Sequence, residues 1–404
     1  MMVADDVRLT LDHCVKCNVC NTFCPVSNVT PLFPGPKYVG PQAERFRLGE
    51  VSPDASLDYC SGCGICTLVC PQGVRIAEIN TKARAAMVGG KISLRNRVLA
   101  RPATLGRLAQ PIAPLANLAL RLRPLRWLLD VVLGVHRAAP LPAFSSASFQ
   151  GWARRHTPPV QAKRTVVYFH GCSTNYYEPR LGRAAVAVLE RNGCRVIIPP
   201  QGCCGLPLQS NGDFTGARRY ARDLVAQLLP YAAQGLNIVT TSTSCSLMLK
   251  REYREILGLD SPDVRRVSER TYDICEYLHD LHDQGELDAG FAPLGITVAY
   301  HAPCQQRGHG IGKPALDLLA LVPGLRVIEM DADCCGTAGT YGYKREKYAI
   351  AMAVGERLFR DIHAAGADLS VCDSETCRWQ IVHGSGRPSV HPVSVLAQAY
   401  GWSP

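Results

Sequence analysis

The sequence predicts an α+β fold, with a helical, cysteine-rich amino-terminal region followed by two copies of one α/β unit. Three observations predict it. Residues 1–90 hold eight cysteines in two clusters. Residues 163–282 and 295–404 alternate between short apolar runs and helix-like stretches. The cysteines of these two stretches recur at nearly the same spacing. We therefore expect four segments: residues 1–90, a linker of residues 91–160, and repeat domains of residues 161–284 and 285–404.

The amino-terminal region carries the most specific motif of the chain. Two runs follow the pattern C-x2-C-x2-C-x3-C-P, and they are Cys14, Cys17, Cys20 and Cys24 before Pro25, and Cys60, Cys63, Cys66 and Cys70 before Pro71. In bacterial ferredoxins with this spacing, the fourth cysteine ligates the other cluster. We therefore expect a ferredoxin-like domain with two 4Fe–4S clusters, one on Cys14, Cys17, Cys20 and Cys70, the other on Cys60, Cys63, Cys66 and Cys24. A structural zinc site usually has two separated pairs of ligands, a pattern that these runs do not follow.

The large number of cysteines indicates metal or redox sites if the chain stays in the cytosol, as its amino terminus predicts. Nineteen of the 404 residues are cysteine, and the first residues, MMVADDVRLTLDHC, lack the apolar stretch of a secretory signal. A chain that stays in the reducing cytosol rarely uses disulfides, so dense cysteine there indicates metal or redox sites.

The linker is strongly basic. Residues 91–150 contain nine Lys or Arg and a single acid, Asp130, and so contribute +8 of the net charge of +10. The rest of the chain is close to neutral, which argues against a protein that binds nucleic acid. Residues 108–137 are apolar but interrupted by prolines and charges, too often for a helix that spans a membrane. We expect one or two short amphipathic helices, with Trp127 near the boundary, that lie on a membrane surface or dock on protein.

The repeat is defined by the spacing of its cysteines. Cys172 is followed by 30 residues, the pair Cys203–Cys204, 40 residues that begin with Gly205, and Cys245. Cys304 is followed by 29 residues, the pair Cys334–Cys335, 41 residues that begin with Gly336, and Cys377. Short β-branched runs precede these cysteines, as in TVVYFHGC and NIVTTSTSC. Strand–helix alternation predicts parallel, Rossmann-like sheets, and sites in such sheets form at the carboxyl ends of strands. Three loops then bring the four cysteines of each unit to one edge.

The adjacent cysteine pairs indicate a polynuclear metal centre. Neighbouring residues of an extended segment point to opposite faces, which suits neither one small tetrahedral ion nor an ordinary disulfide. Two adjacent thiolates can instead hold different atoms of a larger cluster. The glycine that follows each pair allows a positive φ or a close backbone approach.

These motifs together resemble those of the C subunits of anaerobic glycerol-3-phosphate dehydrogenases. The resemblance runs nearly end to end, through CVKCNVCNTFCPVSNVTPLFPGPKYVGP, LDYCSGCGICTLVCP, FHGCSTNY, CCGLPL, CCGTAGTYG and CDSETCRWQI. The repeats are also similar to the cysteine-rich CCG domains of the B subunit of heterodisulfide reductase, the E subunit of succinate dehydrogenase and the iron–sulfur subunits of glycolate and lactate oxidation.

The resemblance implies an oxidoreductase subunit on the cytoplasmic face of the cell membrane. It implies electrons taken from flavin subunits that oxidise glycerol 3-phosphate and passed to membrane quinone. It leaves open whether quinone reduction takes place on this chain.

One feature departs from the resemblance. The CCG pattern commonly ends in C-x2-C, but the first of these positions is Ser242 in one repeat and Ser374 in the other. Related domains that hold a noncubane 4Fe–4S cluster typically use five cysteines. Cys372 shares a strand face with Ser374 and is therefore a candidate for the missing ligand. The candidate ligands of the repeats are Cys172, Cys203, Cys204, Cys245, Cys304, Cys334, Cys335, Cys372 and Cys377. A cubane, a noncubane cluster or zinc stays open for each repeat.

The remaining candidates have lesser expected roles. Cys194 and Cys275 fall outside the pattern and are expected to be buried, and His170 and His301 are expected to pack near the sites. No strand–GxGxxG–helix fingerprint of a dinucleotide site is present. We therefore expect an electron-transfer subunit that does not oxidise an organic substrate alone. Three alternatives remain: a subunit of a related 2-hydroxy-acid oxidase, a thiol or disulfide redox catalyst, and a zinc-stabilised assembly module.

Overall fold

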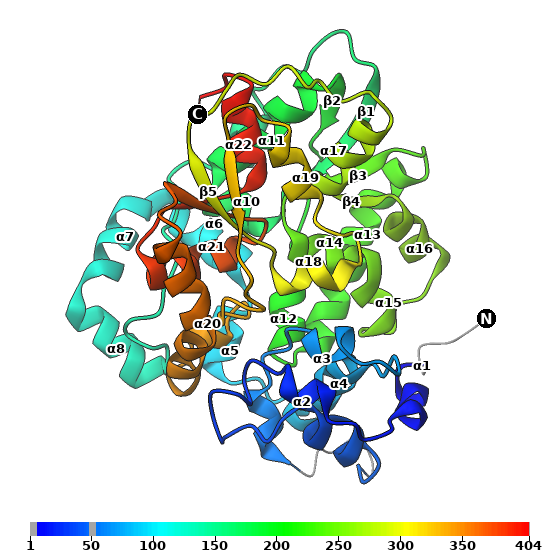
Figure 1. Ribbon diagram of the computed structural model, residues 1–404, viewed down its shortest axis with the longest axis vertical. Helices are drawn as coiled ribbons and strands as arrows, with labels where there is room; N and C mark the ends of the chain where they lie inside the picture. The colour runs from blue at the N-terminus through cyan, green and yellow to red at the C-terminus, as the bar shows by residue number, and fades with distance from the viewer. Residues whose placement is uncertain (1–5, 48–53, 404) are drawn as a thin grey trace.

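The computed structural model describes residues 6–47 and 54–403. Figure 1 shows the amino-terminal region at one end of the molecule, the linker helices at one side, and the two α/β units stacked above. Residues 1–5, on which the prediction of a missing secretory signal partly rests, lie outside the described residues.

The amino-terminal region is built from short helices joined by the cysteine-bearing loops. No strand occurs in its described part, residues 6–47 and 54–90. Its helices are α1 (Asp6–Leu9), α2 (Val19–Thr22), α3 (Ile65–Leu68) and α4 (Ile76–Val88), with single turns at Thr10–His13, Tyr38–Gln42 and Ala55–Tyr59. The buried Lys347 joins the second α/β unit to this region. Its ammonium donates to the backbone carbonyl of Asp58 at 2.6 Å and pairs with the Asp58 carboxylate.

The two helices α7 (Ala113–Arg121) and α8 (Arg123–Leu133) lie in residues 108–137, where the sequence predicts one or two short helices. Further helices lie on either side of them in the linker, and they are α5 (Leu94–Leu99), α6 (Pro102–Ala109) and α9 (Phe149–Ala153). Prolines at the first or second helical position of α6, α7 and α8 explain where these helices begin, since proline is tolerated there and not further in. None of the helices in residues 6–47 and 54–403 is both long and apolar enough to cross a bilayer.

The two α/β units have the same order of strands with helices between them, and the first unit has additional helices. The first contains β1 (Arg164–Phe169), α10 (Gly171–Tyr176), α11 (Pro179–Arg191), β2 (Cys194–Ile197), α12 (Leu206–Ser210), α13 (Phe214–Ala232), β3 (Asn237–Thr240), α14 (Thr243–Leu247), α15 (Tyr253–Glu255), α16 (Pro262–Glu269), β4 (Thr271–Asp273) and α17 (Ile274–Asp283). The second contains β5 (Thr297–His301), α18 (Cys304–His309), α19 (Pro314–Ala320), β6 (Arg326–Glu329), α20 (Arg345–Ala364), β7 (Leu369–Cys372), α21 (Glu375–Ser385), β8 (Ser389–Val390) and α22 (Pro392–Ala399).

Each unit has a four-stranded parallel sheet, in the order β2-β1-β3-β4 in the first and β6-β5-β7-β8 in the second. The prediction of parallel sheets with alternating helices is therefore confirmed. In β1, Val166 and Tyr168 enter one hydrophobic core while Val167 and Phe169 enter another, as the two-residue period of a strand requires. Helices thus cover both faces of each sheet.

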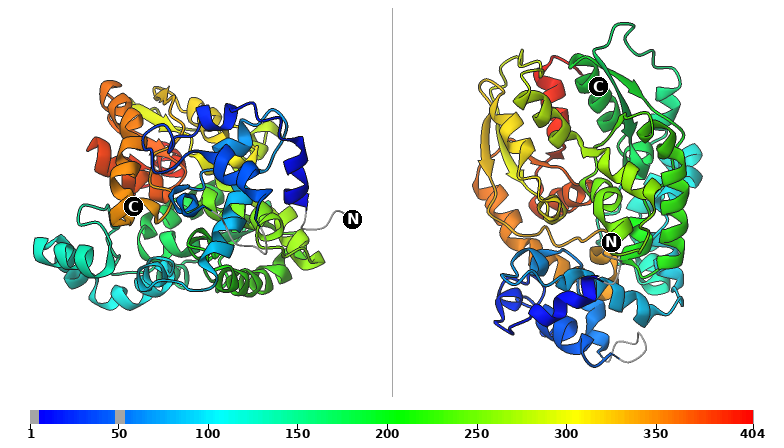
Figure 2. Two further views of the ribbon diagram at one scale, coloured as in Figure 1. Left: turned by 90° about the horizontal axis from the view of Figure 1, so that it is seen from below. Right: turned by 90° about the vertical axis from the view of Figure 1, so that its right-hand side faces the viewer.

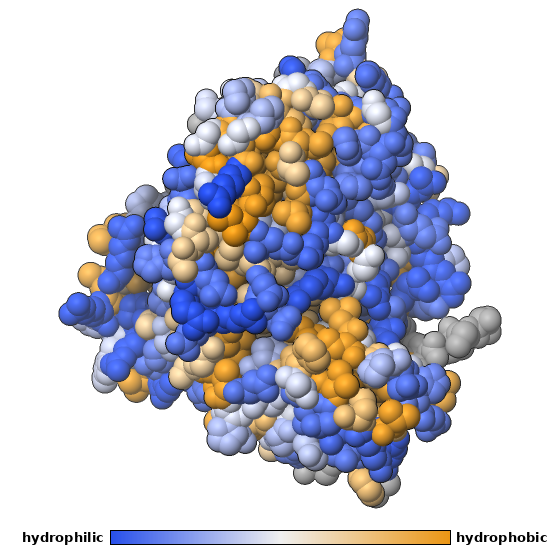
Figure 3. Space-filling model, viewed as in Figure 1, coloured by the Kyte–Doolittle hydropathy of each residue, from blue (hydrophilic) through white to orange (hydrophobic). Residues whose placement is uncertain are grey.

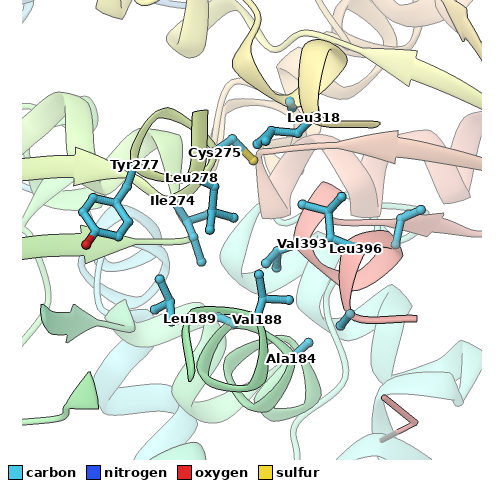
Figure 4. Packing of buried hydrophobic residues seen from close by; sticks show 14 of the residues in the cluster. Ala184, Val188, Leu189, Ile274, Cys275, Tyr277, Leu278, Leu318, Val393 and Leu396 are labelled. Carbon is cyan, nitrogen blue, oxygen red and sulfur yellow. The ribbon is translucent and has the colours of Figure 1, made fainter. Parts of the chain in front are cut away.

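The two units pack against each other in a reciprocal way. Helix α11 of the first contacts α22 of the second, and α17 of the first contacts α19 of the second. Figure 4 shows Val188 and Ile274 of the first unit close to Val393 of the second, within one shared core. The views of Figure 2 show the two sheets side by side with the amino-terminal region across one end. This pseudo-twofold arrangement makes the cysteine-bearing strand ends of the two units face each other.

Candidate iron–sulfur sites

The structure brings Cys14, Cys17, Cys20 and Cys70 together around one small cavity. The amide of Val74 donates to the sulfur of Cys70 at 3.3 Å, which favours a thiolate. Burial, with the nearby Cys70, Cys14 and Cys17, raises the pKa of Cys20 to about 11.

A second small cavity is lined by Cys24, Cys60, Cys63 and Cys66. The amide of Ser27 donates to the sulfur of Cys24 at 3.5 Å. The fourth cysteine of each run thus lies with the first three of the other run, as the ferredoxin spacing predicts.

The loops between these cysteines have the same conformation in both runs. Lys16 and Asn18 have φ of 59° and 73°, and the matching Gly62 and Gly64 have 72° and 82°. Left-handed backbone at a residue other than glycine costs free energy and persists where the surroundings require it. In the first run, Lys16 and Asn18 therefore have strained backbone conformations, and these conformations turn the cysteine sulfurs toward one cavity.

In the first α/β unit, the adjacent cysteines reach different partners. The sulfur of Cys203 lies 3.9 Å from that of Cys172, and the sulfur of Cys204 lies 3.3 Å from that of Cys245. Four thiols from three strand-end loops therefore meet in one cluster.

The second unit repeats this pairing. The thiol of Cys334 contacts Cys304, and the thiol of Cys335 contacts Cys377. The amide of Gly336 donates to the sulfur of Cys334 at 3.3 Å. Gly205 and Gly336 have φ of 87° and 86°, so the glycine after each pair takes a backbone conformation that other residues rarely adopt.

Ser242 and Ser374 occupy equivalent places, as the N-cap residues of α14 and α21, whereas Cys372 lies in strand β7. Ser242 begins α14, where its hydroxyl accepts a hydrogen bond from the amide of Cys245 at 3.3 Å. Ser374 lies beside Cys377 and lines the cavity between the two units. Cys372 is fully buried at the end of β7 and contacts Cys377 from the side of the hydrophobic core.

Cys194 and Cys275 are both fully buried in the core that the two units share. Cys275 also meets Asp273 and Asp373, and single ligand atoms of these three residues lie within 4.8 Å of one another. Burial raises the pKa values of both carboxyl groups, and their mutual repulsion adds to the rise for Asp273.

The two histidines near the sites are also buried. Burial lowers the pKa of His170 to about 4 and lowers the pKa of His301, so both are neutral near pH 7. Neither ring nitrogen of His301 has a hydrogen-bond partner among residues 6–47 and 54–403, and its nearest charged neighbours include Cys377 and Cys334.

A larger cavity of about 520 Å³ separates the two units and extends under α7 and α8. Seven repeat cysteines line it, and they are Cys172, Cys204, Cys245, Cys304, Cys334, Cys335 and Cys377. Cys63 of the amino-terminal region lines it as well. Helix α3 contacts α18, and Cys63 lines the same cavity as Cys304 and Cys334, so the second amino-terminal group lies next to the second α/β unit.

The donor sets fit iron–sulfur clusters. Burial raises the pKa of the Cys66 thiol, and the neighbouring Cys63 raises it further. Thiols in such a group ionise together only when a positive centre is bound. Four thiols around one small cavity, turned inward by left-handed loops, are the donors that a polynuclear iron–sulfur cluster requires.

Sequence reasoning missed three residues of this region. Glu375 accepts a hydrogen bond from Ser173 at 2.9 Å across the two units. Tyr343 and Trp379 line the large cavity. A local sequence pattern could not reveal them, because each reaches the site through packing of distant segments.

Comparisons with known proteins agree with this geometry. The 4Fe-4S dicluster domain family matches residues 10–74, and the cysteine-rich domain family matches residues 166–250 and 298–382. These matches support iron–sulfur clusters as the cofactors of the chain.

Three relatives span different shares of the chain. Lactate utilization protein A of Geobacillus kaustophilus is 31% identical over 44% of this chain and 74% of its own length. The B subunit of fumarate reductase (CoM/CoB) of Methanothermobacter marburgensis is 28% identical over 57% of this chain and 44% of its own length. The C subunit of anaerobic glycerol-3-phosphate dehydrogenase of Escherichia coli (strain K12) is 40% identical over 96% of this chain and 98% of its own length. A match at this level across both cysteine-rich parts means that the chain belongs to the family of C subunits of anaerobic glycerol-3-phosphate dehydrogenase.

Proposed function

We propose that this chain is the electron-transfer subunit of an anaerobic glycerol-3-phosphate dehydrogenase complex. In this proposal it receives electrons from flavin-containing subunits and delivers them to membrane quinone. The observation that carries the proposal is the closeness of Cys63 to Cys304 and Cys334, which puts the amino-terminal thiols next to those of the repeats. A bound iron–sulfur cluster would supply one-electron transfer at each group.

The proposed ligands follow the groups of thiols. Cys14, Cys17, Cys20 and Cys70 would hold one 4Fe–4S cluster, and Cys24, Cys60, Cys63 and Cys66 would hold another. The cysteines of the repeats, with Cys372 as the candidate fifth ligand of the second, would hold one or two further centres. The proposed domains are residues 1–90, 91–160, 161–284 and 285–404, the last two Rossmann-like.

We also propose that α7 and α8 lie on the cytoplasmic face of the cell membrane. Leu118, Trp127, Leu128 and Val132 of these helices are each about half exposed or more. Figure 3 shows hydrophobic and hydrophilic residues interspersed along this edge of the molecule. Arg121, Arg123, Arg126 and Arg137 line a groove beside them. Apolar side chains flanked by arginine complement the interior and the anionic headgroups of a bilayer.

The proposal is tested by measuring whether a quinone reoxidises the reduced chain. The cluster-loaded chain is reduced with dithionite, freed of excess reductant, and mixed anaerobically with a short-tail naphthoquinone while its visible absorption is followed. Reoxidation with formation of quinol supports the proposal. Failure of the quinone to reoxidise the chain contradicts it, because a subunit that delivers electrons to quinone must do so.

One observation favours a second candidate function. Seven cysteines open on the cavity between the units, where a disulfide substrate could meet them. Reoxidation of the reduced chain by an organic disulfide, with release of two thiols, and not by quinone, would favour this thiol–disulfide activity.

A further inference from the structure

The large cavity has the form of a site for an extended apolar molecule. Its volume is about 520 Å³, and the part beside the repeat cysteines is the space that the proposed iron–sulfur centres would fill, which leaves the part along α6, α7 and α8 for a small molecule. The cysteines and Tyr343 line one part of it, and aliphatic side chains of α6, α7 and α8 line another. The cavity therefore connects the thiol groups with the proposed membrane surface.

Helices α7 and α8 are apolar on two opposite faces. Their inner face turns Leu120, Leu125, Leu129 and Leu133 to the cavity. Their outer face exposes other aliphatic residues, including Leu118 at 58% and Val132 at 67%. A helix that covers only a protein core needs one apolar stripe, so apolar residues on both sides indicate apolar surroundings on both sides.

The polar end of the cavity offers one hydrogen-bond donor that lacks a partner. The side chain of Tyr343 is 6% exposed, and its hydroxyl bonds to no other described residue. Its ionisable neighbours are Glu375, Cys335 and Cys377. A buried hydroxyl without a partner is costly, and a ligand that brings an acceptor oxygen recovers that cost.

We propose that this cavity binds a quinone, with a ring carbonyl accepting a hydrogen bond from the Tyr343 hydroxyl and the prenyl tail lying along α7 and α8. This inference rests on the proposed function and adds the place and the contacts of the electron acceptor. The ring then lies beside the thiols of the second repeat. It takes two electrons, one at a time, from the reduced iron–sulfur centres, and its two carbonyl oxygens take two protons from solvent to form the quinol.

Binding is measured on the complete, cluster-loaded chain in detergent with menaquinone-1, whose tail is a single prenyl unit. Ultrafiltration separates free from bound quinone, and extraction and ultraviolet absorption quantify it. We expect about one quinone per chain. Tyr343→Phe removes one hydrogen bond and should weaken binding about fivefold to tenfold. Ala119 lines the cavity, so Ala119→Trp should weaken binding at least about twentyfold by filling it.

Leu118→Trp is the matched control, because it adds an indole on the exposed face of the same helix. It should bind quinone like the wild type. Iron content and circular dichroism of each variant check that the fold is kept. Wild-type affinity in both Ala119→Trp and Tyr343→Phe would overturn the inference, as would equal losses in Ala119→Trp and Leu118→Trp.

The same variants separate this inference from the proposed function. If quinone reoxidises the reduced wild type and all variants alike, the function stands and the cavity is not the site. If quinone binds to the wild type but does not reoxidise it, the binding site stands and the function fails. If the variants lose binding and reoxidation together, both are supported.

Discussion

The hydroxyl of Ser242 donates a hydrogen bond to the carboxylate of Glu375, with its oxygen 3.2 Å from each carboxylate oxygen. The two residues belong to different α/β units, and both are buried. Ser242 stands where the repeat pattern commonly has a cysteine. In this chain, the position joins the two units at the edge of the cavity between them.

Replacing Ser242 with alanine should therefore weaken the contact between the units. Glu375 keeps its bond from Ser173, but α14 loses the Ser242 hydroxyl that accepts from the amide of Cys245, so we expect the free energy of unfolding to fall by about 2 kcal/mol, without loss of iron. Thermal unfolding and iron analysis measure both effects. Ser146→Ala, on an exposed loop, is the control. Loss of iron in Ser242→Ala would instead identify this serine as a ligand.

The glycine after the second cysteine pair should tolerate substitution less than the first. A Cβ on Gly336 would lie 1.9 Å from the backbone oxygen of Ala351, whereas a Cβ on Gly205 would lie 3.2 Å from that of Ala217. Both glycines have positive φ, so each alanine costs about 1 kcal/mol for conformation alone. We expect Gly336→Ala to lower the free energy of unfolding by several kcal/mol more than Gly205→Ala does. We also expect Gly336→Ala to bind less iron. Equal unfolding midpoints for the two variants would contradict this packing.

The repeat explains how far the sequence predicts the fold. The apolar runs before the cysteines become β1, β2, β3, β5, β6 and β7, because their alternating residues fill cores on both faces of each sheet. The edge strands Thr271–Asp273 and Ser389–Val390 are too short for a period of two to identify them. The sequence predicts the two short helices α7 and α8 of residues 108–137, and prolines at the first or second position of these helices mark where they begin.

The site is predictable where ligands lie close in sequence. The fixed spacing of each ferredoxin run determines which thiols meet, as do the strand-end positions of the repeat cysteines. The position of Cys63 beside the second unit and the position of Tyr343 depend on packing between segments that lie far apart in the chain, and no local pattern reports such packing.

Stability should depend on pH through Glu252. Burial raises the pKa of this carboxyl group from 4.5 to about 7, while Gln209 donates to it at 2.6 Å. Between these values the folded chain binds more protons than the unfolded chain, so stability falls as the pH rises from about 4.5 to about 7. In Glu252→Gln, the unfolding midpoint should change less with pH across this window. Glu269→Gln, at an exposed position, should keep the pH dependence of the wild type. An unchanged pH profile in Glu252→Gln would contradict the shift.

Membrane binding should depend on the outer face of α7 and α8. Leu118→Gln with Val132→Gln removes two exposed apolar side chains. The loss of buried apolar area should weaken binding to anionic phosphatidylglycerol vesicles at least about tenfold in a sedimentation assay. Leu32→Gln with Leu68→Gln removes two exposed leucines of the amino-terminal region and should leave binding unchanged. Equal binding by both double variants would contradict the proposal that α7 and α8 bind the membrane.

Iron analysis combined with Mössbauer spectroscopy of the anaerobically reconstituted chain tests the central claim, that the thiols of the amino-terminal region and of the repeats hold iron–sulfur centres. The whole chain should contain more than about eight iron atoms, since the two amino-terminal clusters alone account for about eight. Cys204→Ala and Cys335→Ala should each lose iron and change the spectrum, because each thiol belongs to a group in one repeat. Fewer than about eight iron atoms in the wild type, or unchanged iron and spectra in both variants, would contradict the claim.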